Sequence, residues 1–155
     1  MIKGGYMIST ILVPSDGSKP SQKAAVYAVD LAKQLHASII ILIVIDKRLF
    51  MALEAPASKT SRQLTDTTED YLNEVAGGYA REIKKLCDKN GVAAKVSIRM
   101  GYPVEEIINE ARKSKANLIV MGSRGRSALS ATVLGSVSYG VLHHDKCLPV
   151  LIVRG

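Results

Sequence analysis

A glycine- and serine-rich stretch at residues 122–138 holds the residues with the clearest potential for chemistry. It follows the apolar run Leu118 to Met121, which is typical of a buried strand. Glycine leaves backbone N–H groups accessible, serine adds hydroxyls, and Arg124 and Arg126 add positive charge. Because the first amides of a helix attract anions, a helix that begins at Gly135-Ser136 would suit phosphate. A serine-rich surface loop without a ligand is an equally good interpretation of this stretch alone.

This stretch lies in the most basic part of the chain. The formal net charge is +7, and between Glu110 and Asp145 there are five lysines and arginines but no acidic residue. A local excess of positive charge favours an anionic ligand. A solvated basic surface is the simpler explanation of the total charge. Nucleic acid is disfavoured as a partner, because aromatic residues are scarce and no RNA or DNA motif is visible.

The common nucleotide-binding and nucleophile motifs are missing from the sequence. There is no Gly-x-x-x-x-Gly-Lys-Ser/Thr loop, no Gly-x-Gly-x-x-Gly after the first strand and no Gly-x-Ser-x-Gly elbow. No general base with a matched acid stands out. His143-His144, beside Asp145 and Cys147, fits the end of a helix better than a metal site. We therefore expect no catalytic residues.

The elements that must position this stretch alternate between strands and helices. The apolar run 39–45 has no polar face and indicates a central strand, whereas the alternation in 94–100 indicates an edge strand. Such alternation predicts an α/β fold with three layers: an open, parallel five-stranded sheet with helices on both faces. Strands are expected at 9–14, 38–45, 93–100, 118–121 and 149–153, with helices that begin near Ser18, Asp66, Pro103 and Ser136.

The segment 47–65 breaks this alternation, and we predict a long, mobile loop there, with at most a turn of helix near 48–53. A capping box at Asp66 should start the following helix, on which Tyr71 and Tyr79 are expected to pack rather than to stack on a base. The length of 155 residues predicts a single domain over 1–155. Two widely spaced cysteines, no signal peptide and no long apolar run predict a cytoplasmic protein without membrane insertion.

Two turns should meet at one rim of the predicted sheet. The segment 14–17 follows the first strand, and 122–125 follows the fourth. Carboxyl ends of parallel strands lie at the same edge, and ligands bind there near the switch in strand order. Taken alone, however, Asp16 is explained as a turn-forming residue and Val44 as a residue of the core.

Together these motifs resemble the universal stress protein family, and the resemblance covers nearly the whole chain. Gly122-x-x-Gly125, followed after nine residues by Gly135-Ser136, matches the nucleotide motif of that family. Segments 11–18, 44–46, 101–107 and 149–153 resemble its first strand and turn, the end of its second strand, its Gly-x-Pro-x-Glu-x-Ile segment and its last strand.

The resemblance implies a Rossmann-like fold with strand order 3-2-1-4-5 and a homodimer paired through Pro149 to Val153. It also implies that ATP or AMP is bound as a ligand or regulator in stress response or signalling, with Mg²⁺ or Mn²⁺ held through the phosphates. A slow ATPase or adenylate-handling enzyme is the alternative. Asp16 would lie near the nucleoside, and Val44 would meet the adenine through its backbone. The implied nucleotide-binding residues are Pro14, Ser15, Asp16, Val44, Gly122, Ser123, Arg124, Gly125, Arg126, Gly135, Ser136, Val137 and Ser138.

Overall fold

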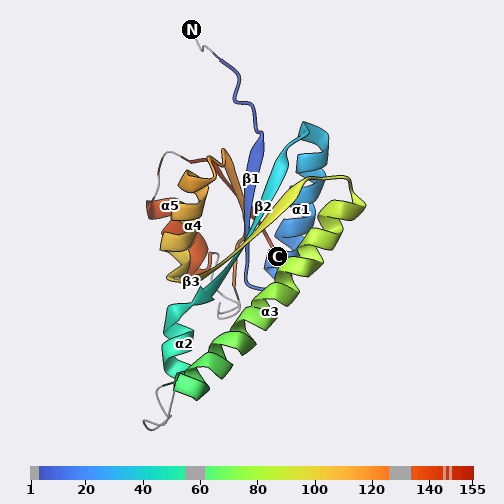
Figure 1. Ribbon diagram of the computed structural model, residues 1–155. Helices are drawn as coiled ribbons and strands as arrows, with labels where there is room; N and C mark the ends of the chain where they lie inside the picture. Colours follow the sequence, from blue (N-terminus) through green and yellow to red (C-terminus); the bar gives the residue numbers. More distant parts are fainter. Residues whose placement is uncertain (1–3, 55–61, 126–133, 145, 147) are drawn as a thin grey trace.

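The computed structural model describes residues 4–54, 62–125, 134–144, 146 and 148–155, and contains one parallel five-stranded sheet (Figure 1). The strand order is β3-β2-β1-β4-β5, which confirms the predicted order. β1 pairs with β2 and β4, and the outer strands β3 and β5 pair with β2 and β4, all in parallel. The strands are β1 (Thr10–Ser15), β2 (Ser38–Asp46), β3 (Ala94–Gly101), β4 (Leu118–Gly122) and β5 (Val150–Val153).

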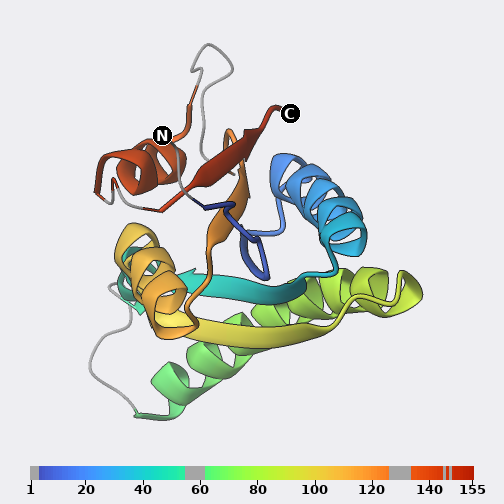
Figure 2. The ribbon, with the colours of Figure 1, turned by 90° about the horizontal axis from the view of Figure 1, so that it is seen from above.

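Helices cover both faces of the sheet and complete the predicted three layers (Figure 2). α1 (Lys19–Leu35) and α3 (Arg62–Lys89) lie on one face, and α4 (Pro103–Lys113) and α5 (Ser136–His144) lie on the other. Each face has its own apolar core, to which β2 contributes alternate residues. Because both faces of β2 are covered, its residues 39–45 are all apolar.

Local sequence signals fix where α1 begins. Ser18 is its N-cap, and the Ser18 hydroxyl accepts a hydrogen bond from the Ser21 N–H at 3.3 Å, as expected for this residue type. Pro20 stands in the first turn, where its missing N–H leaves no intrahelical bond unmade. The helix therefore begins directly after the turn that follows β1.

The prediction of a long loop at 47–65 is wrong. α2 (Lys47–Glu54) begins directly after β2, and α3 begins at Arg62 rather than at the predicted capping box. Only residues 55–61 separate the two helices, and they lie outside the described residues. α2 forms because its sequence consists of good helix formers and because the Asp46 carboxylate accepts a hydrogen bond from the Arg48 N–H at 2.9 Å.

α3 is the longest helix and packs its apolar side on the sheet. Ala76, Ala80, Ile83 and Cys87 are buried there, and burial raises the pKa of the Cys87 thiol. The other cysteine, Cys147, lies outside the described residues. Within the described part of the chain, no helix is long and apolar enough to cross a membrane.

Candidate functional site

The turn between β1 and α1 fixes the Asp16 carboxylate at the carboxyl edge of the sheet. Its Oδ1 accepts a hydrogen bond from the Ser18 N–H at 2.9 Å. The Gly17 N–H donates to the Ser15 hydroxyl at 3.2 Å, and that hydroxyl also lies 3.0 Å from the Ser21 hydroxyl. The side chains of this short segment thus determine the shape of the turn themselves.

The end of β4 is held between helices of the two opposite layers. A Cβ on Gly122 would lie 2.9 Å from the backbone C and O atoms of Pro20, so the first turn of α1 packs directly on this glycine. From the other face, the buried Ser138 hydroxyl donates to the Gly122 carbonyl at 2.9 Å. The Ser123 N–H donates to the Val153 carbonyl at 3.0 Å. The loop after β4 therefore starts from a fixed point.

Asp16 and the two later motif glycines come together, as the parallel topology predicts. A Cβ on Gly125 would lie 2.8 Å from the Asp16 Oδ2 atom, so the two loops are in direct contact. The Gly135 N–H donates to the Ser123 carbonyl at 2.6 Å, and a Cβ on Gly135 would lie 3.2 Å from the Cα of Arg124. The structure thus brings the first turn of α5 against the loop after β4.

Val44 lies level with Asp16 at the same edge. β1 ends at Ser15, which is opposite Ile43, so Val44 stands one residue beyond the end of its β1 neighbour. Its side chain packs with the core on the α4 and α5 face. Further along, Arg48 holds the pKa of the Asp46 carboxyl below its usual value, chiefly through their side-chain hydrogen bond.

The remaining predicted residues differ in exposure. Ser136 is exposed in the first turn of α5, whereas Val137 packs toward the α4 and α5 core. Pro14 is buried near the end of β1, and Ser123 is buried directly after β4. The Ser138 hydroxyl is bonded within the protein, so its role here is to join α5 to β4. Arg126 lies outside the described residues.

The group considered for metal binding is only partly described, since Asp145 and Cys147 lie outside the described residues. Among the described residues, no three His, Cys, Asp or Glu side chains are grouped so as to hold a metal ion. His143 lies in the last turn of α5, its Nδ1 lies 3.0 Å from the Tyr139 carbonyl, and its ring stacks on that of Tyr139. Tyr79, in contrast, packs against Gly17 beside the site. Its spacing along α3 predicts packing but gives no sign of this neighbour.

Residues 7–154 match the universal stress protein family. The chain belongs to this family. It is 36% identical to the universal stress protein YxiE of Bacillus subtilis over 156 residues, which cover 96% of this chain and 100% of that protein. The fold is similar to a solved structure of protein MJ0577 of Methanocaldococcus jannaschii, with a TM-score of 0.84 and 29% identity over 97% of this chain and 98% of that one.

Two solved relatives contain adenine nucleotides. One universal stress protein, in complex with cAMP, is 25% identical, with a TM-score of 0.63 over 94% of this chain and 95% of that one. Another, from Archaeoglobus fulgidus, is in complex with dAMP. Its 16% identity and TM-score of 0.57, over 95% of this chain and 98% of that one, show a shared fold. Members of the family thus bind adenine nucleotides.

Proposed function

We propose that this universal stress protein binds ATP or AMP and uses it as a ligand or regulator in stress response or signalling, not as a rapidly turned-over substrate. The observation that carries the proposal is the contact between Asp16 and Gly125, which joins the loops after β1 and β4 at the carboxyl edge of the sheet. Ligands of open parallel sheets bind at such a switch in strand order. The relatives that hold cAMP and dAMP support an adenine nucleotide.

Charge assigns the two ends of the nucleotide. A carboxylate repels phosphate but accepts hydrogen bonds from ribose hydroxyls, so Asp16 belongs at the nucleoside. Val44 stands at the same level, one residue past the end of β1, where its backbone can meet the base. The phosphates belong at Gly135 and Ser136, where the N–H groups and dipole of α5 favour an anion and Arg124 is adjacent.

A divalent ion would be held through the phosphates. The described residues contain no three-ligand group for a metal, so Mg²⁺ or Mn²⁺ would rely on phosphate oxygens and water. ATP affinity should then rise with added Mg²⁺, whereas the protein without nucleotide should not bind Mg²⁺ measurably. Calorimetric titration of ATP into protein with and without Mg²⁺ tests the first expectation. Titration of Mg²⁺ into protein without nucleotide tests the second.

Titration of the pure protein with ATP tests the proposal directly. In the double variant Gly125→Val and Gly135→Val, the new side chains meet the Asp16 carboxylate and the backbone of Arg124, respectively. We expect ATP affinity to fall by at least about a hundredfold, or about 2.7 kcal/mol.

Gly5→Val is the matched control, since a Cβ there has no neighbour within 4 Å. It should bind ATP as the wild type does. A double variant that is folded by circular dichroism and binds with wild-type affinity would contradict the proposal. Mass analysis of the ligand that co-purifies with the protein distinguishes ATP from AMP.

We also propose a homodimer paired through β5 and the preceding residue, Pro149 to Val153. β5 lies at one edge of the sheet, and Val150, Leu151 and Ile152 are only partly buried there. Pairing with a second copy would cover this apolar edge. Sedimentation at micromolar concentration should therefore give a dimer, and a monomer would contradict the pairing.

A further inference from the structure

Tyr79 of α3 packs directly against the loop that carries Asp16. A Cβ built on Gly17 would overlap the Cε1 and Cζ atoms of Tyr79 and would lie 2.6 Å from its Cδ1. The φ of Gly17 is +76°, a backbone conformation that favours glycine. The aromatic ring therefore occupies the space beside the bare Cα of the residue that follows Asp16.

Three hydrogen bonds of this loop lie within the loop and the start of α1. The Gly17 N–H donates to the Ser15 hydroxyl, and the Gln22 side-chain amide donates to the Gly17 carbonyl, both at 3.2 Å. The Ser18 N–H donates to Asp16 at 2.9 Å. These hydrogen bonds set the shape of the turn. Because both partners of each bond lie in the turn or the start of α1, the bonds do not hold the turn against α3. The Tyr79 ring, in contrast, connects the turn to α3.

A hollow of about 230 Å³ borders the Tyr79 ring between α1 and α3. Its lining includes Ser15, Gly17 and Gln22 from the loop and the start of α1, and Tyr79 and Ile83 from α3. Closely packed neighbours prevent a segment from moving, whereas an adjacent cavity leaves it space to move. Removal of the ring would thus enlarge the hollow and give the turn room to move toward α3, away from Gly125.

We propose that Tyr79 is a positioning residue for nucleotide binding. Its ring holds Gly17 and, through it, keeps the Asp16 carboxylate against Gly125 in the loop after β4. This inference rests on the proposed function, which assigns Asp16 to the nucleoside. The ring acts from the α1 and α3 face without touching the nucleotide. An ordered turn raises affinity because it loses less conformational entropy when the ligand binds.

Variants of Tyr79 test this with two independent measurements on the full chain. The first is amide hydrogen exchange of Gly17 and Ser18 by NMR without nucleotide, and the second is ATP affinity by calorimetry. Tyr79→Ala should speed exchange of both amides and weaken ATP binding by at least about tenfold. Tyr79→Phe, which keeps the ring, should restore both readouts to near wild type.

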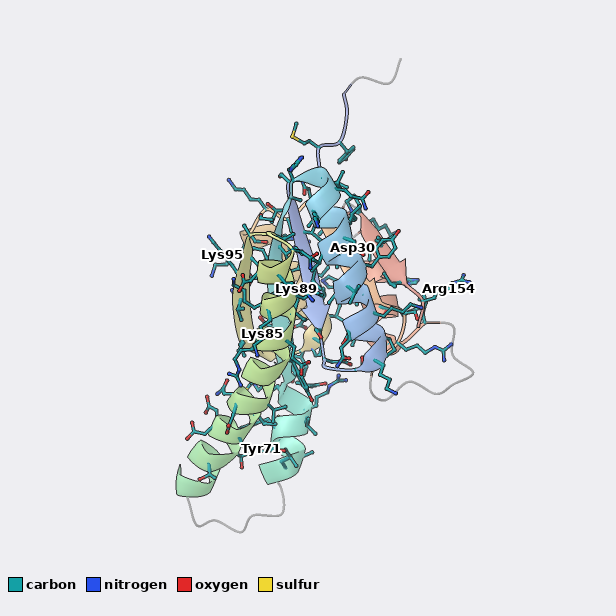
Figure 3. The ribbon with its side chains drawn as sticks, turned by 90° about the vertical axis from the view of Figure 1, so that its right-hand side faces the viewer. Asp30, Tyr71, Lys85, Lys89, Lys95 and Arg154 are labelled. Atoms are coloured by element: carbon teal, nitrogen blue, oxygen red, sulfur yellow. The ribbon has the colours of Figure 1, made fainter. Side chains whose placement is uncertain are left out.

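Tyr71→Ala is the matched control. Tyr71 is on the same helix, is 62% exposed and lies in the part of α3 that extends beyond the sheet beside α2 (Figure 3). In Tyr71→Ala, neither the amide hydrogen exchange of Gly17 nor the ATP affinity should differ from wild type. If Tyr71→Ala weakens ATP binding as much as Tyr79→Ala does, the inference is overturned.

A double-mutant cycle with Gly17→Ala probes the contact from the other side. If Tyr79 acts through Gly17, the losses of ATP affinity in Gly17→Ala and Tyr79→Ala should be less than additive. Tyr79→Leu, which keeps an apolar side chain, replaces Tyr79→Ala if the alanine variant does not fold. Unchanged exchange of Gly17 and Ser18 in the folded variant overturns the inference. If wild type binds neither ATP nor AMP, the proposed function fails, and the exchange data still decide whether Tyr79 holds the turn.

Discussion

Replacement of Gly122 by alanine tests how closely α1 packs on the end of β4. The new Cβ would lie 2.9 Å from the C and O atoms of Pro20 and 3.1 Å from the N atom of Ser21. These backbone atoms cannot rotate away, and overpacking of this kind destabilises by about 1–3 kcal/mol. Alanine also restricts the unfolded chain, which offsets about 0.4–1 kcal/mol of this loss. We therefore expect the free energy of unfolding to fall by about 1–2 kcal/mol.

Gly78→Ala is the matched control, with the opposite expected sign. Gly78 lies inside α3, and a Cβ there would meet only the Arg81 Nη2 atom, at 3.9 Å, which is an ordinary contact. Alanine is more stable than glycine within a helix by about 1 kcal/mol. The free energy of unfolding should thus rise by about 0.5–1 kcal/mol.

Differential scanning calorimetry and urea unfolding of the wild type and the two variants measure both effects. In a chain of this length, 1 kcal/mol changes Tm by about 2–4 °C. Gly122→Ala should therefore lower Tm by about 2–8 °C, and Gly78→Ala should raise it by about 1–4 °C. A neutral or stabilising Gly122→Ala would refute the close approach of α1. Equal losses of stability in both variants would refute the conclusion that the atoms around the new Cβ decide whether alanine stabilises or destabilises the protein.

Two further predictions concern charged side chains. Glu110 is 6% exposed and its Oε2 accepts hydrogen bonds from Arg99 Nε at 2.6 Å and from the Ser97 hydroxyl at 3.2 Å. Glu110→Ala should lower the free energy of unfolding in urea by about 2 kcal/mol, less than for a fully buried pair because Arg99 is partly exposed. The pKa of Asp46 is lowered by its hydrogen bond with Arg48, so this carboxylate stabilises the fold above about pH 4 and stops doing so as pH falls through its folded pKa. Asp46→Asn should be less stable than wild type at about pH 7, and this gap in urea midpoint should narrow toward about pH 3. A gap of the same size at both pH values would contradict this.

The strands could be predicted because burial leaves a pattern in the sequence. Residues 39–45 are apolar throughout because β2 is covered on both faces. The alternating run 94–100 corresponds to the edge strand β3, although its Val96, Ile98 and Met100 side chains are 36–44% exposed, so burial does not account for that alternation. α2 could not be predicted in this way. Its Leu49, Met51 and Leu53 side chains are 50–56% exposed, so these apolar residues do not mark positions of the core.

The contact between Asp16 and Gly125 could be predicted in outline because parallel strands end at one edge. The partners of individual side chains could not. The Ser138 hydroxyl bonds the Gly122 carbonyl because of how α5 approaches β4. Likewise, Tyr79 packs on Gly17 because α3 crosses the sheet beside the turn. Both contacts join elements that lie far apart in the sequence. The spacing of residues along the chain does not determine such contacts.

The three motif glycines are required for close approach, since none of them has a left-handed backbone. Their neighbours nevertheless differ. At Gly122 and Gly135 a Cβ would meet backbone atoms, whereas at Gly125 it would meet the end of the Asp16 side chain. Backbone atoms cannot move aside unless a whole helix or loop shifts, whereas the Asp16 carboxylate can rotate. The first two glycines therefore determine how the helices and the loop after β4 pack, while Gly125 determines where the carboxylate at the proposed nucleoside end points. Gly17, which contacts the Tyr79 ring of α3, lies outside the motif.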